Sequence, residues 1–206
     1  MVKKIYLLGG AREEKTYADL DKEIVEGLEN KSMLVIDFAK SDKEKIADKK
    51  ERLKNHFGKL GIKSITFTSD YDSNEEIKKQ ISEVEFIHIV GGDTELLIEQ
   101  LRQRDLIPDL KNFEGIIEGN SAGAMLLCRE AICADEGREI IKGVGILNLQ
   151  IDVHYNKTHD KKLIEISKDK KIYGIPEQSA IIVENGDLKF INEIYLFSEG
   201  KKQELN

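Results

Sequence analysis

The sequence predicts an α/β fold in which helices cover both faces of a mostly parallel central sheet, with added strands towards the C-terminus. Apolar runs alternate with segments of helical spacing over the first two-thirds of the 206 residues, and these runs are apolar on both faces. After about residue 130, short apolar segments and turns replace this alternation. No linker or repeat divides the chain, so we expect a single domain over residues 1–206.

Each apolar run of the first part is interpreted as one parallel strand. The runs cover residues 3–9, 33–38, 62–68, 84–90 and 115–118. Charged or helix-period segments separate them, at residues 13–30, 42–60, 74–82 and 94–104. Because parallel strands of an open sheet carry sites at their carboxyl ends, the glycine-rich turns after residues 90 and 118 are expected at one edge of the sheet.

The last third predicts strands and hairpins with one helix among them. The candidate strands lie near residues 143–153, 172–175, 179–184, 188–191 and 193–197, and the helix covers roughly 158–169. The sequence Asn-Gly-Asp at residues 185–187 is typical of a hairpin turn.

Composition argues against several classes of protein. Hydrophobic residues make up 40% and charged residues 34%, as in ordinary globular chains. The formal net charge of −7 argues against nucleic-acid binding. No apolar stretch approaches the roughly 18 residues of a membrane span, and the first apolar run is too short for a signal peptide. Cys128 and Cys133 have no metal-like partner set, so we expect reduced thiols in a cytoplasmic protein.

The segment GNSAG, at residues 119–123, joins an apolar run to a helix-like pattern. It fits the nucleophile-elbow pattern G-x-S-x-G, in which a sharp strand-to-helix turn requires small flanking residues. The free N–H groups of the following helix would face a developing negative charge. A serine that only caps the helix would give the same local pattern. Ser121 is therefore a candidate nucleophile that needs partners elsewhere in the chain.

A serine nucleophile needs a base, and the chain has four histidines. His56 lies in a charged helix and is expected to be solvated, whereas His88 lies within a strand and is expected in the core. His154 ends an apolar run downstream of the elbow, so it is the preferred base, with His159 in reserve. Only 33 residues separate Ser121 from His154, which is too few for the intervening crossover of an α/β-hydrolase.

The remaining parts of such a site are an acid and two oxyanion donors. Spacing alone leaves Asp135, Glu136 and Asp152 open as the acid that orients the imidazole. The N–H of Ala122, directly after the serine, is one expected oxyanion donor. The pair Gly91-Gly92 is a plausible source of the second, because backbone without side chains approaches a substrate closely.

These segments together resemble the serine peptidases of the dipeptidase E (aspartyl dipeptidase) and cyanophycinase family. The quoted matches are VGGDTELLIEQLR (90–102), IIEGNSAGAMLL (116–127), IDVHYN (151–156) and YGIPEQSAIIVENG (173–186), with IYLLGG (5–10) compatible as the first strand. The resemblance covers nearly the whole chain. It implies a three-layer sandwich similar to class I glutamine amidotransferases.

The resemblance also implies roles for individual residues. Ser121 matches the family nucleophile and His154 its histidine. The family's acid follows the serine at a spacing that falls on Glu136 or its neighbour Asp135. Gly92 and Ala122 match the backbone donors of the oxyanion hole.

Substrate contacts are less constrained by the resemblance. Asp93 stands where many members carry asparagine, and Asn120 flanks the elbow. An aspartyl substrate needs a cation, for which Lys157 is one candidate. The others are Arg129, Arg138, Lys161 and Lys162.

The sequence thus favours a serine-type peptidase that hydrolyses short peptides, as a dipeptidase or exopeptidase of aspartyl dipeptidase type. It would need no metal or organic cofactor and would act as a monomer or homodimer without a nucleic-acid or membrane partner. The alternatives are a cyanophycinase-like enzyme acting on aspartyl-linked substrates and a non-catalytic binding protein on the same fold. Amidotransferase chemistry is disfavoured because it uses cysteine at the elbow, where this chain has Ser121.

Overall fold

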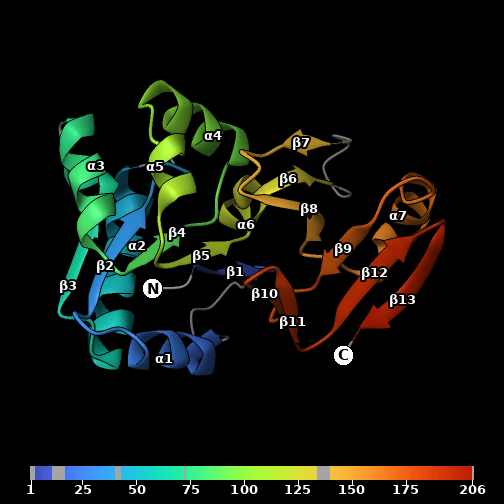
Figure 1. Ribbon diagram of the computed structural model, residues 1–206, viewed down its shortest axis with the longest axis horizontal. Helices are drawn as coiled ribbons and strands as arrows, with labels where there is room; N and C mark the ends of the chain where they lie inside the picture. Colours follow the sequence, from blue (N-terminus) through green and yellow to red (C-terminus); the bar gives the residue numbers. More distant parts are fainter. Residues whose placement is uncertain (1–2, 11–16, 40–42, 72, 134–139, 206) are drawn as a thin grey trace.

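The computed structural model describes residues 3–10, 17–39, 43–71, 73–133 and 140–205 (Figure 1). Two sheets organise these residues, one of seven strands and one of six. The fold is α/β with helices on both faces of the first sheet, as predicted.

The seven-stranded sheet has the order β11-β10-β1-β5-β4-β2-β3. Its five parallel strands are β1 (Lys4–Leu8), β5 (Ile116–Asn120), β4 (Phe86–Ile89), β2 (Ser32–Ile36) and β3 (Ser64–Phe67). The central strands are almost entirely buried, which explains why their sequences are apolar on both faces. The antiparallel strands β10 (Ala180–Glu184) and β11 (Asp187–Ile191) extend the sheet beyond β1.

Helices cover both faces of this sheet (Figure 1). One face carries α1 (Ala18–Glu26) and α2 (Lys43–Leu60). The other carries α3 (Asn74–Glu83), α4 (Thr94–Gln103), α5 (Ile107–Asn112) and α6 (Ala122–Leu127). A short 3-10 helix, η2 (Thr68–Asp70), follows β3. Amphipathic helices on two sides bury the sheet, which leaves the ends of its strands as the accessible places for a site.

The six-stranded sheet has the order β13-β12-β9-β8-β6-β7 and lies beside the first one (Figure 1). Its strands are β6 (Cys128–Ala131), β7 (Ile141–Lys142), β8 (Leu147–Val153), β9 (Ile172–Ile175), β12 (Ile194–Ser198) and β13 (Lys201–Leu205). The 3-10 helix η3 (Lys157–His159) and helix α7 (Asp160–Ile166) connect β8 to β9. One core cluster contains buried residues of both sheets, and a smaller one surrounds Tyr155.

The C-terminal third contains more sheet than its sequence indicates. The predicted hairpin turn is present: Glu184 pairs with Asp187, and Asn185 and Gly186 between them have φ of 54° and 88°. The expected helix at 158–169 is shorter, as η3 followed by α7. In the described part of the chain, no helix combines the length and apolar character needed to cross a membrane.

Candidate active site

The carboxyl ends of three adjacent strands gather the candidate residues. In the register of the sheet, β5 lies between β1 and β4, with Leu8 beside Asn120 and Ile89 beside Gly119. The three turns that follow these strands therefore emerge next to one another. They contain the pairs Gly9-Gly10 and Gly91-Gly92 and the candidate nucleophile Ser121. The glycine-rich turns after residues 90 and 118 therefore lie at one edge of the sheet, as predicted.

Ser121 occupies a sharp turn between β5 and α6. Its φ of 52° and ψ of −106° are unusual for a residue with a side chain, as in a strained nucleophile elbow. The turn is held by the Ser121 N–H, which donates to the Leu8 carbonyl at 3.1 Å. The flanking glycines are required by close approach. A Cβ on Gly119 would lie 2.6 Å from the Gly123 carbonyl carbon, and one on Gly123 would lie 2.4 Å from the Ile89 carbonyl oxygen.

The glycine pair after β4 lies against the serine. A Cβ on Gly91 would come within 3.2 Å of the Ser121 Cβ, and one on Gly92 within 2.4 Å of the Ala39 carbonyl oxygen. Ala122, fully buried, begins α6, where the first N–H groups have no acceptor within the helix. The structure thus brings both predicted oxyanion donors, Gly92 and Ala122, to the neighbourhood of Ser121.

His154 follows the last residue of β8 and contacts Ser121 directly. The Ser121 hydroxyl lies 2.8 Å from His154 Nε2, the distance of a good hydrogen bond. The histidine backbone is left-handed, with φ of 54°, and its N–H donates to the Gly9 carbonyl at 2.8 Å. Its ring lies against Gly10, where a Cβ would be only 2.1 Å from His154 Cε1. The preferred base is therefore in place, held by the turn after β1.

Among the described residues, the carboxylate that contacts His154 is that of Glu177, a residue that the sequence analysis did not name. His154 Nδ1–H donates to Glu177 Oε1 at 3.1 Å. Glu177 lies in the turn between β9 and β10, next to Pro176. Asp135 and Glu136, the acids favoured by the family spacing, lie outside the described residues. The available signal for Glu177 was its place after the apolar run 172–175, since β9 pairs with the β8 strand that ends before His154.

Asp152 was one of the possible acids and His159 the second choice of base, but these two residues pair with each other. His159 Nδ1 lies 2.7 Å from Asp152 Oδ2, and both side chains are buried. The amide of Asn156 defines the tautomer: its oxygen accepts from the Thr158 N–H, so its nitrogen donates to His159 Nε2 at 3.0 Å. His159 Nε2 is then the acceptor, so Nδ1 carries the proton and donates to Asp152 Oδ2.

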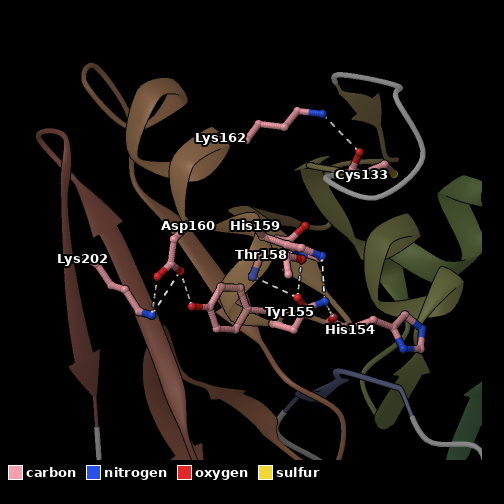
Figure 2. A network of polar contacts seen from close by, with 10 residues as sticks. Cys133, His154, Tyr155, Thr158, His159, Asp160, Lys162 and Lys202 are labelled. Carbon is pink, nitrogen blue, oxygen red and sulfur yellow. Dashed lines mark hydrogen bonds and ion pairs between the residues drawn. The ribbon is translucent and has the colours of Figure 1, made fainter.

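Figure 2 shows how the segment after His154 is anchored. The hydroxyl of Tyr155 donates to Asp160, and Lys202 on β13 reaches the same carboxylate at 3.0 Å. On the other side, Lys162 donates to the Cys133 carbonyl at 3.4 Å. Contacts from α7 and β13 thus hold Tyr155, the residue after His154, in position. The His154 ring points away from this network.

A cavity of about 540 Å³ opens beside Ser121 and His154. Its titratable lining in the described residues consists of carboxylates and imidazoles: Asp93, Glu95, Asp152, His154 and His159. The cavity is therefore polar and carries more negative than positive charge along this lining.

The three predicted substrate contacts differ in position. Asp93 lines the cavity, and its carboxylate caps α4 by accepting from the Leu96 N–H at 3.0 Å. Lys157 is exposed in η3 and is not part of the cavity lining. Asn120 precedes the nucleophile, and its side-chain oxygen is buried without a hydrogen-bond partner among the described residues. Within those residues, no cluster of three or more histidine, cysteine or carboxylate side chains could hold a metal ion.

A second polar group lies beneath the elbow, on the α1–α2 face of the sheet. Glu118, on β5, accepts from His88 Nδ1 at 2.6 Å, and the predicted burial of His88 is confirmed. His56 was expected to be solvated, but it is half-buried and bonds to the buried Asp21 at 2.6 Å. Burial raises the pKa of Glu118 to about 7; burial and the nearby Glu118 charge raise the pKa of Asp21 to about 7.

Comparison with known structures supports the same fold. A peptidase from an acI-B1 Actinobacterium superposes with a TM-score of 0.76 at 20% identity, covering 100% of this chain and 94% of that one. A Listeria monocytogenes EGD-e protein provisionally assigned as a peptidase E superposes with a TM-score of 0.70 at 18% identity, covering 93% of this chain and 98% of that one. A search of the curated proteins gave no match.

The family follows from the sequence as a whole. The sequence profile of peptidase family S51 matches residues 5–191, which include all three strand-end turns, the Ser121–His154 contact and Glu177. This span is most of the chain, and the family is the one that the sequence segments resemble. The protein is therefore a peptidase, and it belongs to peptidase family S51.

Proposed function

We propose that the protein is a serine peptidase that hydrolyses short peptides, as a dipeptidase or exopeptidase, through Ser121, His154 and Glu177. The observation that carries the proposal is the pair of hydrogen bonds at His154. Nε2 lies 2.8 Å from the Ser121 hydroxyl, and Nδ1 lies 3.1 Å from Glu177. A nucleophile, a base and an orienting carboxylate in this order form a catalytic triad.

In the proposed reaction, Ser121 Oγ attacks the scissile carbonyl while its proton passes to His154 Nε2. The imidazolium is stabilised by Glu177, which accepts from Nδ1 and also selects the tautomer that leaves Nε2 free to take the proton. His154 then returns its proton to the departing amine. A water molecule, activated by the same imidazole, releases the acyl group from Ser121.

The N–H groups of Gly92 and Ala122 are proposed to hold the negative oxygen that forms during attack. The close packing of the two turns supports this role, since a Cβ on Gly91 would lie 3.2 Å from the Ser121 Cβ and Gly92 lines the cavity. Glycine at position 91 keeps a side chain away from Ser121, and glycine at position 92 lets the turn pack against Ala39.

The cavity supports a small substrate. Its volume of about 540 Å³ falls within the range of roughly 300–1,000 Å³ found for small-molecule sites. This size does not favour the polymeric substrate of a cyanophycinase-like enzyme. The intact Ser121–His154 contact likewise does not favour a non-catalytic binding protein.

An aspartyl preference has little support from the described lining. Asp93, Glu95 and Asp152 are the acidic groups there, and no lysine or arginine of the described residues accompanies them. A substrate carboxylate would be repelled rather than paired. We therefore limit the proposal to short peptides and leave the aspartyl dipeptidase type as one outcome of the assay.

Hydrolysis of a peptide library tests the proposal. Purified protein is incubated with dipeptides that include Asp-X members, with tripeptides and with decapeptides. We expect the dipeptides or tripeptides to be hydrolysed fastest and Ser121→Ala to lose at least roughly three orders of magnitude in turnover. Ser82→Ala, which changes an exposed helix serine bonded to the Lys79 carbonyl, is the control and should match the native protein. Efficient internal cleavage of the decapeptide would contradict the exopeptidase proposal.

A reducing, cytoplasmic setting belongs to the same proposal. Its support is that Cys128 and Cys133 are both buried and are not joined in a disulfide.

A further inference from the structure

We propose that Tyr17 is a positioning residue of this site, whose hydroxyl fastens the turn beneath His154 to the loop that carries Glu177. The inference rests on the proposed Ser121–His154–Glu177 triad. Tyr17 precedes α1 and is remote in sequence from all three residues.

The hydroxyl of Tyr17 faces two carbonyl oxygens from different parts of the chain. It lies 3.1 Å from the Gly10 oxygen and 3.2 Å from the Ser179 oxygen, and the side chain is only 7% exposed. One hydroxyl proton is shared between two acceptors in such an arrangement. Burial raises the pKa of Tyr17 above its ordinary value, so the hydroxyl stays protonated and remains a donor at any pH at which the enzyme works.

The first of these carbonyls belongs to the turn that seats the histidine. The Gly9 oxygen accepts from the His154 N–H at 2.8 Å, and the His154 ring lies against Gly10. Gly10 has φ of 105°, a left-handed conformation suited to glycine. A shift of this turn would move the imidazole with it.

The second carbonyl belongs to the loop that presents the acid. Ser179 follows Glu177 by two residues and is buried. Two backbone bonds already join this loop to the turn: Gly9 N–H to the Ser179 oxygen at 3.0 Å, and Gln178 N–H to the Gly10 oxygen at 3.3 Å. The Tyr17 hydroxyl adds a side-chain bridge between the same two carbonyls.

Removing the Tyr17 hydroxyl should affect the position of the catalytic groups more than the folding of the chain. Without the hydroxyl, the Gly10 and Ser179 oxygens each keep one backbone donor, so neither is left unsatisfied. Phenylalanine would also fill the same buried space. The loss should therefore fall on the relative position of His154 and Glu177, whose hydrogen bond is long enough, at 3.1 Å, to weaken with a small displacement.

The test is Tyr17→Phe, measured first by a reaction that needs no knowledge of the substrate. A fluorophosphonate reacts with an activated serine, whose oxygen attacks phosphorus and displaces fluoride, so the rate of phosphonylation at Ser121 reports the base and its orientation. We expect a fall of roughly ten- to hundredfold, since small misplacements of catalytic groups have effects of that order. With the best peptide of the library, kcat should fall by a similar factor while KM changes less than about twofold.

A spectroscopic measurement separates positioning from general stability. The downfield Nδ1 proton of His154, assigned by its absence in His154→Ala, should be present in the native protein and weakened or lost in Tyr17→Phe. Ser167→Ala is the matched control, because it also removes a buried hydroxyl that donates to a main-chain carbonyl, that of Ile164 at 3.1 Å. It should lower the melting temperature slightly and leave labelling and the Nδ1 proton unchanged.

The possible outcomes are distinguishable. Labelling of Tyr17→Phe at the native rate, with native protein reacting at Ser121, would overturn the inference and leave the triad intact. Failure of Tyr17→Phe to fold would show that the hydroxyl is structural and would also overturn it. Absence of labelling at Ser121 in the native protein would overturn the proposed function itself, and this inference with it.

Discussion

Replacing Gly119 by alanine is expected to destabilise the protein and to displace the candidate nucleophile. The added Cβ would lie 2.6 Å from both the carbonyl carbon and oxygen of Gly123 and 2.7 Å from the Ala124 nitrogen. All three are backbone atoms of the first turn of α6, which cannot move without moving Ser121. Relief of the clash therefore requires the elbow to open.

The size of the effect follows from these contacts. Overpacking in a core typically costs about 1–3 kcal/mol, and contact with backbone atoms places Gly119→Ala at the upper end, at about 3 kcal/mol. For a chain of 206 residues, each 1 kcal/mol lowers the melting temperature by about 2–4 °C. We expect a fall of roughly 6–12 °C by calorimetry or circular dichroism, together with loss of peptidase activity.

Gly58→Ala is the matched control. Gly58 lies within α2, and apart from its chain neighbours and the helix's own backbone, no atom of the described residues would come within 4 Å of its added Cβ. Alanine is favoured over glycine in a helix interior by about 1 kcal/mol, so this variant should melt about 2–4 °C higher with native activity. A Gly119→Ala protein that melts within about 2 °C of the native one and keeps its activity would refute the close-packed elbow.

Three further changes test other parts of the account. Glu177→Gln should lower kcat by roughly 10²–10⁴-fold, as loss of the orienting acid does in other triads, whereas Glu136→Gln should have little effect; the reverse ranking in a steady-state assay would transfer the role to Glu136. Gly10→Ala should abolish hydrolysis while the protein stays folded, because its Cβ would lie 2.1 Å from the His154 ring; normal turnover would show that the ring is not seated there. The raised pKa of Glu118 means that the folded state binds its proton more tightly, so its contribution to stability is full below about pH 4 and is lost as the pH rises through about 7. The melting temperature should therefore depend less on pH over that range in Glu118→Gln than in the native protein. An equal pH dependence in the two proteins would contradict the raised pKa of Glu118.

The first sheet could be predicted from the sequence because its strands are buried on both faces. Runs such as residues 33–38 and 84–90 have no alternative in a polar loop or an exposed helix; β2 overlaps the first run and β4 lies within the second. The second sheet was only partly predicted. Strand β13 has the sequence KKQEL and β7 has two residues, so neither carries an apolar pattern; their pairing comes from neighbours that the fold supplies.

The residues of the candidate site were likewise only partly predictable from the sequence. Ser121 and its glycines were predictable, because a sharp strand-to-helix turn imposes local rules on the residues around it. His154 was found because histidine is rare here, with four in the chain. The chain has 39 acidic residues, so residue type alone could not select the acid. Glu177 reaches His154 through the pairing of β8 with β9, which brings together positions separated by 23 residues.

In the proposed mechanism, His154 activates Ser121 as a nucleophile. The most direct test of this mechanism is peptide mapping by mass spectrometry after treatment of the native protein and of His154→Ala with a fluorophosphonate at neutral pH. We expect one covalent adduct, on Ser121 of the native protein, and labelling of His154→Ala that is slower by at least roughly a hundredfold. An unmodified Ser121 in the folded native protein, or equal labelling of the two proteins, would contradict the mechanism.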